Sequence, residues 1–124
     1  MESAFTRMYF SAWIKPTDLT GIETIFDEGG ATNGIGLRLN GATLEGAVRN
    51  GGVQVNAGSL AVPNDGEWHH VVMTFDEGDF RVYLDGIGGV LESASYTTVG
   101  AHSGDGGLGY MDNGTGFGLS LIHI

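Results

Sequence analysis

Apolar and polar residues alternate along much of the first 85 positions of this chain, which is the pattern of β-strands with two different faces. We expect strands in five segments with this period of two: residues 8–14, 34–39, 44–49, 71–75 and 80–85. In residues 8–14 both sets of alternate positions are largely apolar or aromatic, so we expect both faces of this strand to be covered. In residues 34–39 one face carries Ile and Leu, and the lighter face carries Gly34, Gly36 and Arg38. No stretch of eleven residues has a helical stripe with a cap, so the sequence predicts an all-β fold.

Short turn signals separate the predicted strands. The six signals are Glu28-Gly29-Gly30, Asn40-Gly41, Asn50-Gly51-Gly52, Asn64-Asp65-Gly66, Glu77-Gly78-Asp79 and Asp85-Gly86. Asn-Gly and Asp-Gly pairs accept the positive φ that tight hairpin turns require. Turns that recur after each short strand are typical of an antiparallel sandwich or barrel.

Composition and charge narrow the range of partners. The chain has 124 residues, which suits one domain, and 15 acidic against 5 basic residues give it a net charge of −10. This charge repels phosphate backbones and anionic lipid, so we expect no nucleic-acid partner, whereas cations and neutral ligands such as sugars stay open. The absence of cysteine excludes disulfides, zinc fingers and thiol nucleophiles. No apolar run reaches the ~18–20 residues of a membrane span, so we expect no membrane insertion.

The residues that could carry catalysis do not form a catalytic pattern. His69 and His70 are adjacent, and neighbouring side chains of a strand point to opposite faces, so the pair cannot bind one metal ion. The acidic stretch 76–79 is the tip of a predicted hairpin, where carboxylates favour the turn and stay solvated. No G-x-S-x-G nucleophile motif is present. We expect no catalytic residues in this chain.

Three segments, in this order, resemble one known family. They are Phe10–Pro16 (FSAWIKP), Gly66–Asp76 (GEWHHVVMTFD) and Phe80–Gly86 (FRVYLDG). Together they resemble the laminin-G-like domains of the concanavalin A-like lectin/glucanase superfamily, over roughly residues 8 to 100. The resemblance implies two antiparallel sheets packed as a jelly-roll sandwich, with loops for ligands at its rims. Glucanases of this superfamily resemble one another in a strand with E-x-D-x-x-E or E-x-D-x-E, which this chain lacks.

The end of the chain departs from the family pattern. The family usually closes with a strand of the form F-x-G-x-I-D-[DE]-V-R-[IV]-Y, which the residues after Phe117-Gly118 do not continue. Leu119–Ile124 (LSLIHI) instead resembles the translation of a transposon-end adapter used in short-read sequencing libraries; a natural apolar strand is the alternative. We therefore expect residues 1–118 to be a single domain that is incomplete at one or both ends and lacks its closing strand. Residues 119–124 are expected to be a non-native tail.

Calcium is the cofactor that the resemblance suggests, because laminin-G-like domains often hold this ion with hard oxygen ligands on rim loops. The candidate ligands are Asp27, Glu28, Asp105, Asp112 and Asn113. The first two are expected after the second strand, and the last three lie in the glycine-rich stretch 100–118, which is expected to be a long loop. The candidates for stacking on sugar rings are Tyr96, Tyr110 and Phe117. A solvated acidic loop without metal, and aromatic rings packed in the core, are the alternatives.

These observations predict a non-catalytic binding or adhesion module of a larger secreted or cell-surface protein. It would recognise a glycan or a protein surface through rim loops, with calcium as a possible aid, and other domains of a longer parent chain would accompany it. One alternative is an accessory domain of a polysaccharide-degrading enzyme whose catalytic site lies in another domain. A purely structural β-sandwich is the other.

Overall fold

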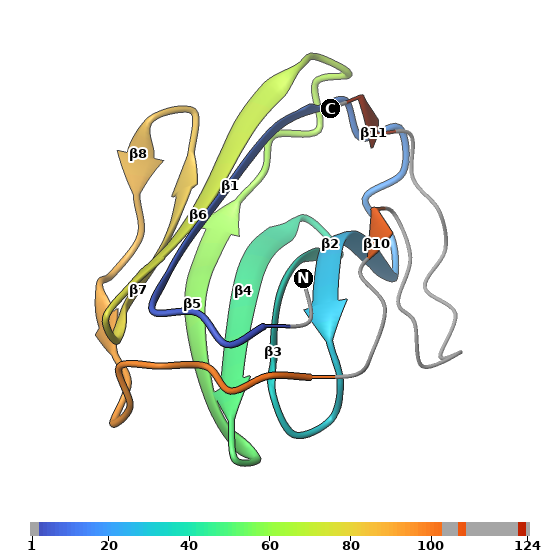
Figure 1. Ribbon diagram of the computed structural model, residues 1–124. Helices are drawn as coiled ribbons and strands as arrows, with labels where there is room; N and C mark the ends of the chain where they lie inside the picture. The colour runs from blue at the N-terminus through green and yellow to red at the C-terminus, as the bar shows by residue number, and fades with distance from the viewer. Residues whose placement is uncertain (1–2, 103–106, 109–121, 124) are drawn as a thin grey trace.

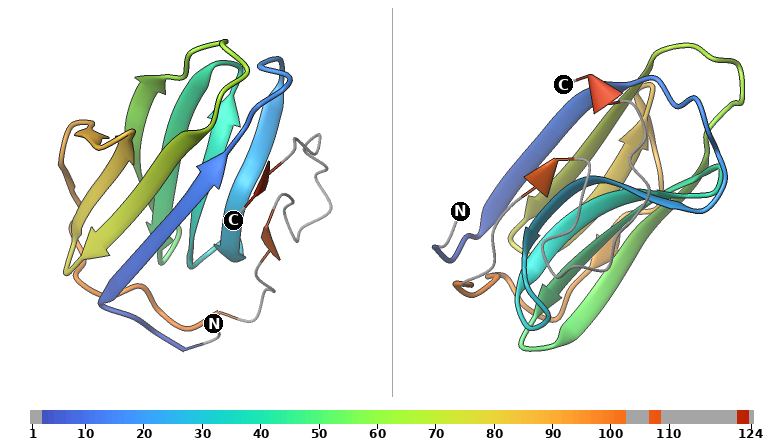
Figure 2. Two further views of the ribbon diagram at one scale, coloured as in Figure 1. Left: turned by 90° about the horizontal axis from the view of Figure 1, so that it is seen from above. Right: turned by 90° about the vertical axis from the view of Figure 1, so that its right-hand side faces the viewer.

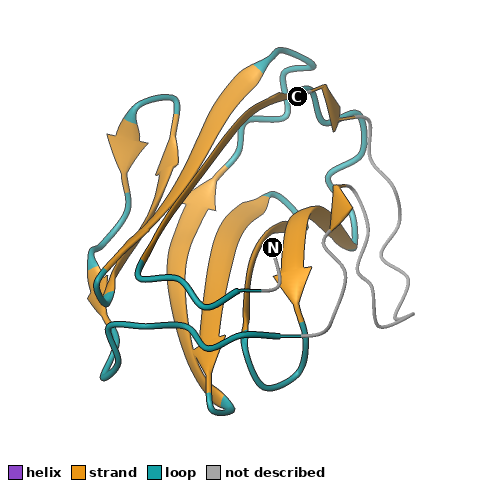
Figure 3. Cartoon of the chain, in the orientation of Figure 1, coloured by secondary structure: helices purple, strands orange, loops and turns teal. Residues whose placement is uncertain are grey.

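The computed structural model describes residues 3–102, 107–108 and 122–123, and every regular element among them is a β-strand (Figures 1 and 3). In chain order the strands are β1 (Arg7–Ile14), β2 (Ile22–Gly29), β3 (Gly34–Asn40), β4 (Thr43–Asn50), β5 (Val53–Ala61), β6 (His69–Asp76), β7 (Asp79–Leu84), β8 (Ile87–Gly88), β9 (Glu92–Ser93), β10 (Gly107–Leu108) and β11 (Ile122–His123). The described residues include no helix long and apolar enough to cross a membrane.

The strands form two antiparallel sheets that pack face to face, and Figure 2 shows the two layers from two directions. The six-stranded sheet has the order β11-β1-β6-β7-β8, with β9 also paired to β7. The five-stranded sheet has the order β10-β2-β3-β4-β5. Successive strands change sheets after β1, β5, β9 and β10. The all-β fold and the antiparallel sandwich expected from the sequence are confirmed.

Left-handed backbone conformations occur at the predicted turns. Between β6 and β7, Glu77 and Gly78 have φ of 49° and 104°. Between β7 and β8, Asp85 and Gly86 have φ of 50° and 82°. Two successive positive φ values characterise a type I′ turn, whose twist matches that of the strands it joins. An acidic residue followed by glycine therefore ends each strand and returns the chain along its neighbour.

The core lies between the sheets and consists of the inward side chains at alternate strand positions. Those least exposed, at 3% or less, include Ile35, Leu37, Leu39, Leu44, Val48, Val71, Met73, Phe75, Phe80 and Val82. Gly46 of β4 also faces inward, and a Cβ there would lie only 2.9 Å from Cγ2 of Val82. Phe10 and Phe26 stack across the two sheets with ring centroids 4.6 Å apart. The apolar alternation in the sequence thus supplies both halves of one core.

The five expected strands are all present, as β1, β3, β4, β6 and β7. The expectation that both faces of residues 8–14 are covered is wrong, because the outward side chains of Tyr9 and Trp13 are 63% and 55% exposed. These two rings lie on the outer face of the six-stranded sheet, where no second layer packs on them among the described residues.

Two long strands, β2 and β5, are not predicted by the alternation. In β2 the polar residues Glu23 and Thr24 are buried, and the pairing with β3 shifts at a bulge between Thr24 and Phe26. A bulge adds one residue to a strand and interrupts its period of two. The long loop expected at 100–118 contains the short strand β10, which pairs with Phe26 and Asp27 of β2.

Segments near both ends of the described chain pair with the sandwich. Phe5 forms an isolated bridge with Val99, and β11 pairs with Trp13 and Ile14 of β1. The limits of the domain at 1–118, its missing closing strand and the non-native origin of 119–124 stay predictions.

Candidate functional site

A groove of about 280 Å³ lies on the outer face of the five-stranded sheet, across β2, β3, β4 and β5. Its lining includes strand residues whose side chains point away from the core, together with Gly30 and Ala31, which follow β2. These strands lie side by side across the lower centre of Figure 1.

One row of paired residues crosses the groove from β2 to β5. Asp27 of β2 lies opposite Gly36 of β3. Gly36 lies opposite Ala47 of β4, which lies opposite Asn56 of β5. Because residues opposite each other in antiparallel strands share a face, a carboxylate and an amide stand at the ends of the row with two small residues between them. Three inter-strand spacings make the row about 14 Å long. Oδ1 of Asp27 lies beside the middle of the row, since a Cβ on Gly36 would be 3.5 Å from it.

Two polar pairs border this row. On one side, Arg38 of β3 lies opposite Glu45 of β4, and its Nε donates to Oε1 of Glu45 at 2.6 Å. On the other side, Arg49 of β4 lies opposite Gln54 of β5 and donates to its Oε1 through Nη2. Each pair is displaced from the row by two residues along the strands, which is roughly 7 Å. The site is therefore a trough with a low floor and two hydrogen-bonding walls.

Hydrogen bonds hold the wall formed by Arg49 and Gln54. Nη1 of Arg49 donates to the carbonyl of Ala31 at 2.7 Å, and Nε2 of Gln54 donates to Oδ1 of Asn56 at 2.7 Å. The carbonyl oxygen of the Asn56 side chain is thus engaged, whereas its Nδ2 donates to no atom in the described part of the chain. Asn56 can therefore offer two N–H donors to a ligand.

Asn33 ties the rim of the groove to two other segments. Its Nδ2 donates to the carbonyl of Ala101 at 2.9 Å, and its Oδ1 accepts the N–H of Gly51 at 2.8 Å. Gly29 begins this turn with a φ of 105°, and a Cβ there would lie 2.4 Å from the carbonyl oxygen of Asn33. Only glycine fits this position. The rim is thereby organised in advance, which lowers the entropy cost of binding.

Charged residues of both signs line the groove. Arg38 and Arg49 are cationic, and Asp27, Glu28 and Glu45 are anionic, but the side chain of Glu28 is buried and points to the other face of β2. The outward-facing charges therefore balance, in contrast to the net charge of −10 on the whole chain. Hydrogen-bond donors and acceptors alternate in this site, and its electrostatic potential is not dominated by charge of one sign. Such a site favours a polar, uncharged ligand over a strongly anionic one.

The structure separates the two described calcium candidates. Asp27 and Glu28 lie within β2, not after it, and point to opposite faces. Asp27 lies on the groove row, whereas Glu28 is 6% exposed and its Oε1 is 3.4 Å from Nε2 of the buried His102 side chain. Over residues 3–102, 107–108 and 122–123, no group of three or more His, Cys, Asp or Glu is placed to hold a metal ion. Asp27 and Glu28 therefore do not fit one calcium site.

Among the aromatic candidates, Tyr96 is anchored beside the core and does not line the groove. Its hydroxyl donates toward the carbonyls of Val48 and Val53 at 3.1 and 3.0 Å, and its ring centroid is 6.4 Å from that of Phe75. Burial raises the pKa of this hydroxyl. The remaining candidate residues lie outside the described part of the chain: Asp105, Tyr110, Asp112, Asn113 and Phe117.

His69 and His70 point to opposite faces, as expected from their positions in a strand. His69 is only 6% exposed and faces inward. His70 lies on the outer face of the six-stranded sheet, where its ring centroid is 4.9 Å from that of Trp13. The two rings therefore do not form one site.

The family model of the concanavalin A-like lectin/glucanases superfamily that represents laminin G domains matches residues 2–111. The chain belongs to this family. The resemblance found in the three sequence segments is thereby confirmed. Among curated proteins, no sequence matches the chain.

Solved structures share the sandwich fold at low sequence identity. Domains LG4-5 of the mouse laminin α1 chain align with a TM-score of 0.66 and 17% identity, over 77% of this chain and 26% of that one. The CBM40 of the Ruminococcus gnavus IT-sialidase aligns with a TM-score of 0.70 and 15% identity, over 94% of this chain and 72% of that one. The binding domain of botulinum neurotoxin DC, in complex with rat synaptotagmin II, aligns with a TM-score of 0.59 and 14% identity, over 82% of this chain and 28% of that one. This chain thus spans 26% of the length of the laminin structure. The solved structures that share its fold are mostly binding domains.

Proposed function

We propose that this chain is a non-catalytic glycan-binding module and that it holds a short, uncharged saccharide in the groove on the five-stranded sheet. The observation that carries the proposal is the row from Asp27 to Asn56, with Gly36 and Ala47 as its floor. A sugar presents hydroxyl groups around a flat ring, and each hydroxyl can donate to a carboxylate and accept from an amide or a guanidinium. The groove supplies these groups at its ends and along both walls.

The shape of the groove supports a saccharide that lies across the strands. The row of about 14 Å is longer than one sugar ring and suits a short oligosaccharide. Because Gly36 and Ala47 place little bulk on the floor, a ring can approach the sheet closely while the walls contact its edge hydroxyls. Of the described residues that line the groove, the one aromatic residue is Phe26, and its ring stacks on Phe10. Hydrogen bonds, not ring stacking, would therefore supply the specificity.

The structural neighbours support a binding role of this general kind. The CBM40 of the Ruminococcus gnavus IT-sialidase was also solved bound to α2,3-sialyllactose, and the botulinum neurotoxin DC binding domain was solved with a protein, rat synaptotagmin II. By analogy we place the module outside the cell, in a larger secreted or cell-surface protein. The balanced charges of this groove lead us to propose an uncharged glycan, and a protein surface is the competing partner.

Calcium enters the proposal only through residues outside the described part of the chain. Asp105, Asp112 and Asn113 stay the candidate ligands, because Asp27 and Glu28 diverge. No contact of the groove that we describe depends on the ion.

A glycan array probed with the full chain tests the proposal, with neutral and sialylated oligosaccharides on the same surface. We expect neutral oligosaccharides to bind and single monosaccharides to bind weakly or not at all. Backbone amide shifts in NMR spectra should then locate the ligand at Gly36, Ala47 and Arg38. Binding that shifts only amides of the six-stranded sheet would refute the groove, and the absence of any glycan ligand would favour a protein partner.

A further inference from the structure

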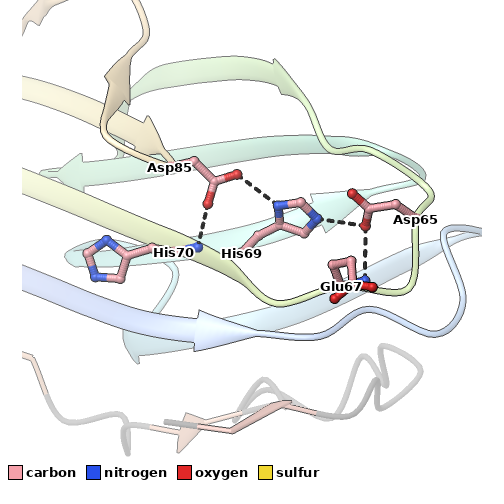
Figure 4. Close-up of polar contacts among 5 residues, drawn as sticks. All are labelled: Asp65, Glu67, His69, His70 and Asp85. Atoms are coloured by element: carbon pink, nitrogen blue, oxygen red, sulfur yellow. Dashed lines mark hydrogen bonds and ion pairs between the residues drawn. The ribbon is translucent and has the colours of Figure 1, made fainter.

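His69 is a buried histidine held between two carboxylates, and none of the three residues lines the groove. It is the first residue of β6, and its side chain is 7% exposed. On one side lies the loop of residues 62–68 between β5 and β6, and on the other lies the turn at the end of β7 (Figure 4).

Each ring nitrogen of His69 faces a different carboxylate. Nδ1 is 2.8 Å from Oδ2 of Asp85, and Nε2 is 3.0 Å from Oδ1 of Asp65. Both carboxylates are also held by the backbone. Oδ1 of Asp85 accepts the N–H of His70 at 2.8 Å, and Oδ1 of Asp65 accepts the N–H of Glu67 at 3.0 Å (Figure 4). These N–H groups favour the ionised carboxylates, so neither Asp85 nor Asp65 readily supplies a proton to the ring.

Only the protonated ring can donate to both partners. A neutral imidazole carries one N–H, so one of its nitrogens would turn a lone pair toward an ionised carboxylate at about 3 Å. We propose that Asp65, His69 and Asp85 form a protonation-sensitive latch, which holds the 62–68 loop while His69 is an imidazolium and loosens it when the ring loses its proton.

The charged groups that face the latch come from the loop and from the end of β7. Burial lowers the pKa of His69, but the hydrogen bonds and charges of Asp85 and Asp65 outweigh it, so the pKa is raised above its ordinary value of 6.5. Ile14, which lies opposite His69 on β1, carries no charge. Burial raises the pKa of Asp85, but its hydrogen bonds with the His69 ring and the His70 N–H lower it overall.

The direction of the pH dependence follows from the raised pKa. A histidine that is more basic in the closed state stabilises that state fully below pH 6.5, and the stabilisation is lost as the pH rises through the folded pKa. Each unit by which the pKa is raised changes the opening equilibrium about tenfold. The loop also carries Trp68, whose ring has Nζ of Lys15 5.9 Å above its centroid, so opening would separate this cation–π pair.

Hydrogen exchange of the 62–68 amides in the full chain tests the latch, measured from pH 5 to 8.5 and corrected for the intrinsic exchange rate. We expect protection to fall as the pH rises through the folded pKa of His69, by on the order of tenfold per unit of raised pKa. His69→Gln should abolish this step, and Asp65→Asn should move it to lower pH because one carboxylate is lost. His70→Gln is the matched control and should keep the step. Equal corrected protection at pH 5.5 and 8.5, or a step that persists in His69→Gln, would overturn the proposal.

A second measurement needs no variant and therefore stands even if His69→Gln does not fold. Imidazole nitrogen shifts in NMR spectra report whether each ring nitrogen carries a proton. We expect both nitrogens of His69 to be protonated at pH 5.5, with loss of one proton above pH 6.5. A His69 ring with a single proton at pH 5.5 would show that no imidazolium holds the loop.

Discussion

Gly36 of β3 and Ala47 of β4 lie directly opposite each other on the outer face of the five-stranded sheet. Asp27 and Asn56 extend the same row to the strands on either side. Two small residues in the middle of a four-strand row create a depression that a larger side chain at either position would fill. The groove therefore depends on the small size of the residues at positions 36 and 47 as much as on its polar groups.

Ala47→Phe tests this dependence, because a phenyl ring on the floor would occupy the space we assign to a saccharide. We expect glycan affinity to fall at least tenfold, about 1.4 kcal/mol, measured by titration calorimetry. Ala61→Phe is the matched control, since Ala61 is exposed at the end of β5 and does not line the groove. Unchanged affinity in Ala47→Phe would place the binding site elsewhere.

Asn33→Ala should loosen the rim of the groove. The substitution removes the hydrogen bonds to the Ala101 carbonyl and from the Gly51 N–H, which we expect to cost about 1–2 kcal/mol of unfolding free energy. Urea unfolding measures this loss, and glycan affinity should weaken several-fold. Asn64→Ala serves as the comparison, because its side chain makes no hydrogen bond within the described residues; an equal effect of both changes would contradict the role of Asn33.

Gly46→Ala should destabilise the core. The added Cβ would lie 2.9 Å from Cγ2 of Val82 and 3.1 Å from Cζ of Phe80, and overpacking of this kind costs about 1–3 kcal/mol. The urea midpoint should fall accordingly. Gly30→Ala is the control, since a Cβ at that position meets nothing within 4 Å. A midpoint for Gly46→Ala within error of the parent chain would mean that the facing side chains can move aside.

Acid should weaken the fold through Asp85. Burial raises the pKa of this carboxyl, but the hydrogen bonds from His69 and from the His70 N–H lower it below its ordinary value of 3.8 overall. A lowered pKa adds stability above pH 3.8 that is lost as the pH falls through the folded pKa. We expect Asp85→Asn to remove part of this acid dependence between pH 5 and 2.5, and asparagine also accepts the φ of 50° at this turn. An unchanged acid profile would mean that Asp85 does not contribute.

Calcium is tested by thermal melting in millimolar calcium and in chelator. A bound ion should raise the melting temperature with a concentration dependence set by its affinity. Asp105→Asn and Asp112→Asn should each remove the shift, whereas Asp27→Asn should leave it, because Asp27 and Glu28 diverge. Identical melting curves in calcium and chelator would remove the ion from the proposal.

The strands that the sequence predicts are those whose burial follows a simple alternation. Residues 34–39 show this well, since their lighter face of Gly34, Gly36 and Arg38 is the face that lines the groove. The small residues on this face could have indicated the groove from the sequence. Glycines in a strand also mark bulges and bends, however, so they do not identify a binding site by themselves. β2 escapes prediction because a bulge and two buried polar residues, Glu23 and Thr24, disturb its period.

The candidate site residues chosen by residue type, among those that the structure describes, do not form the expected sites. Residue type suggested Asp27 and Glu28 as one pair, but neighbouring positions in a strand diverge once the segment is known to be β2. Tyr96 was a candidate for sugar stacking because it is aromatic. In the structure its hydroxyl donates toward the carbonyls of Val48 and Val53 in the β4–β5 hairpin. Residue type alone does not tell which face a side chain takes or which partner it meets.

By itself, the sequence determined the all-β sandwich, its hairpin turns, the net charge of −10 and the family. Each of these depends on residue types and on spacing between neighbours, which local sterics and the burial of apolar side chains translate directly into strands and turns. Only the tertiary structure decided the groove and the latch. The row from Asp27 to Asn56 takes one residue from each of four strands, and His69 meets Asp85 across 16 positions of sequence. Such contacts depend on sheet register and loop closure, which arise when the whole chain packs and not from any short segment within it.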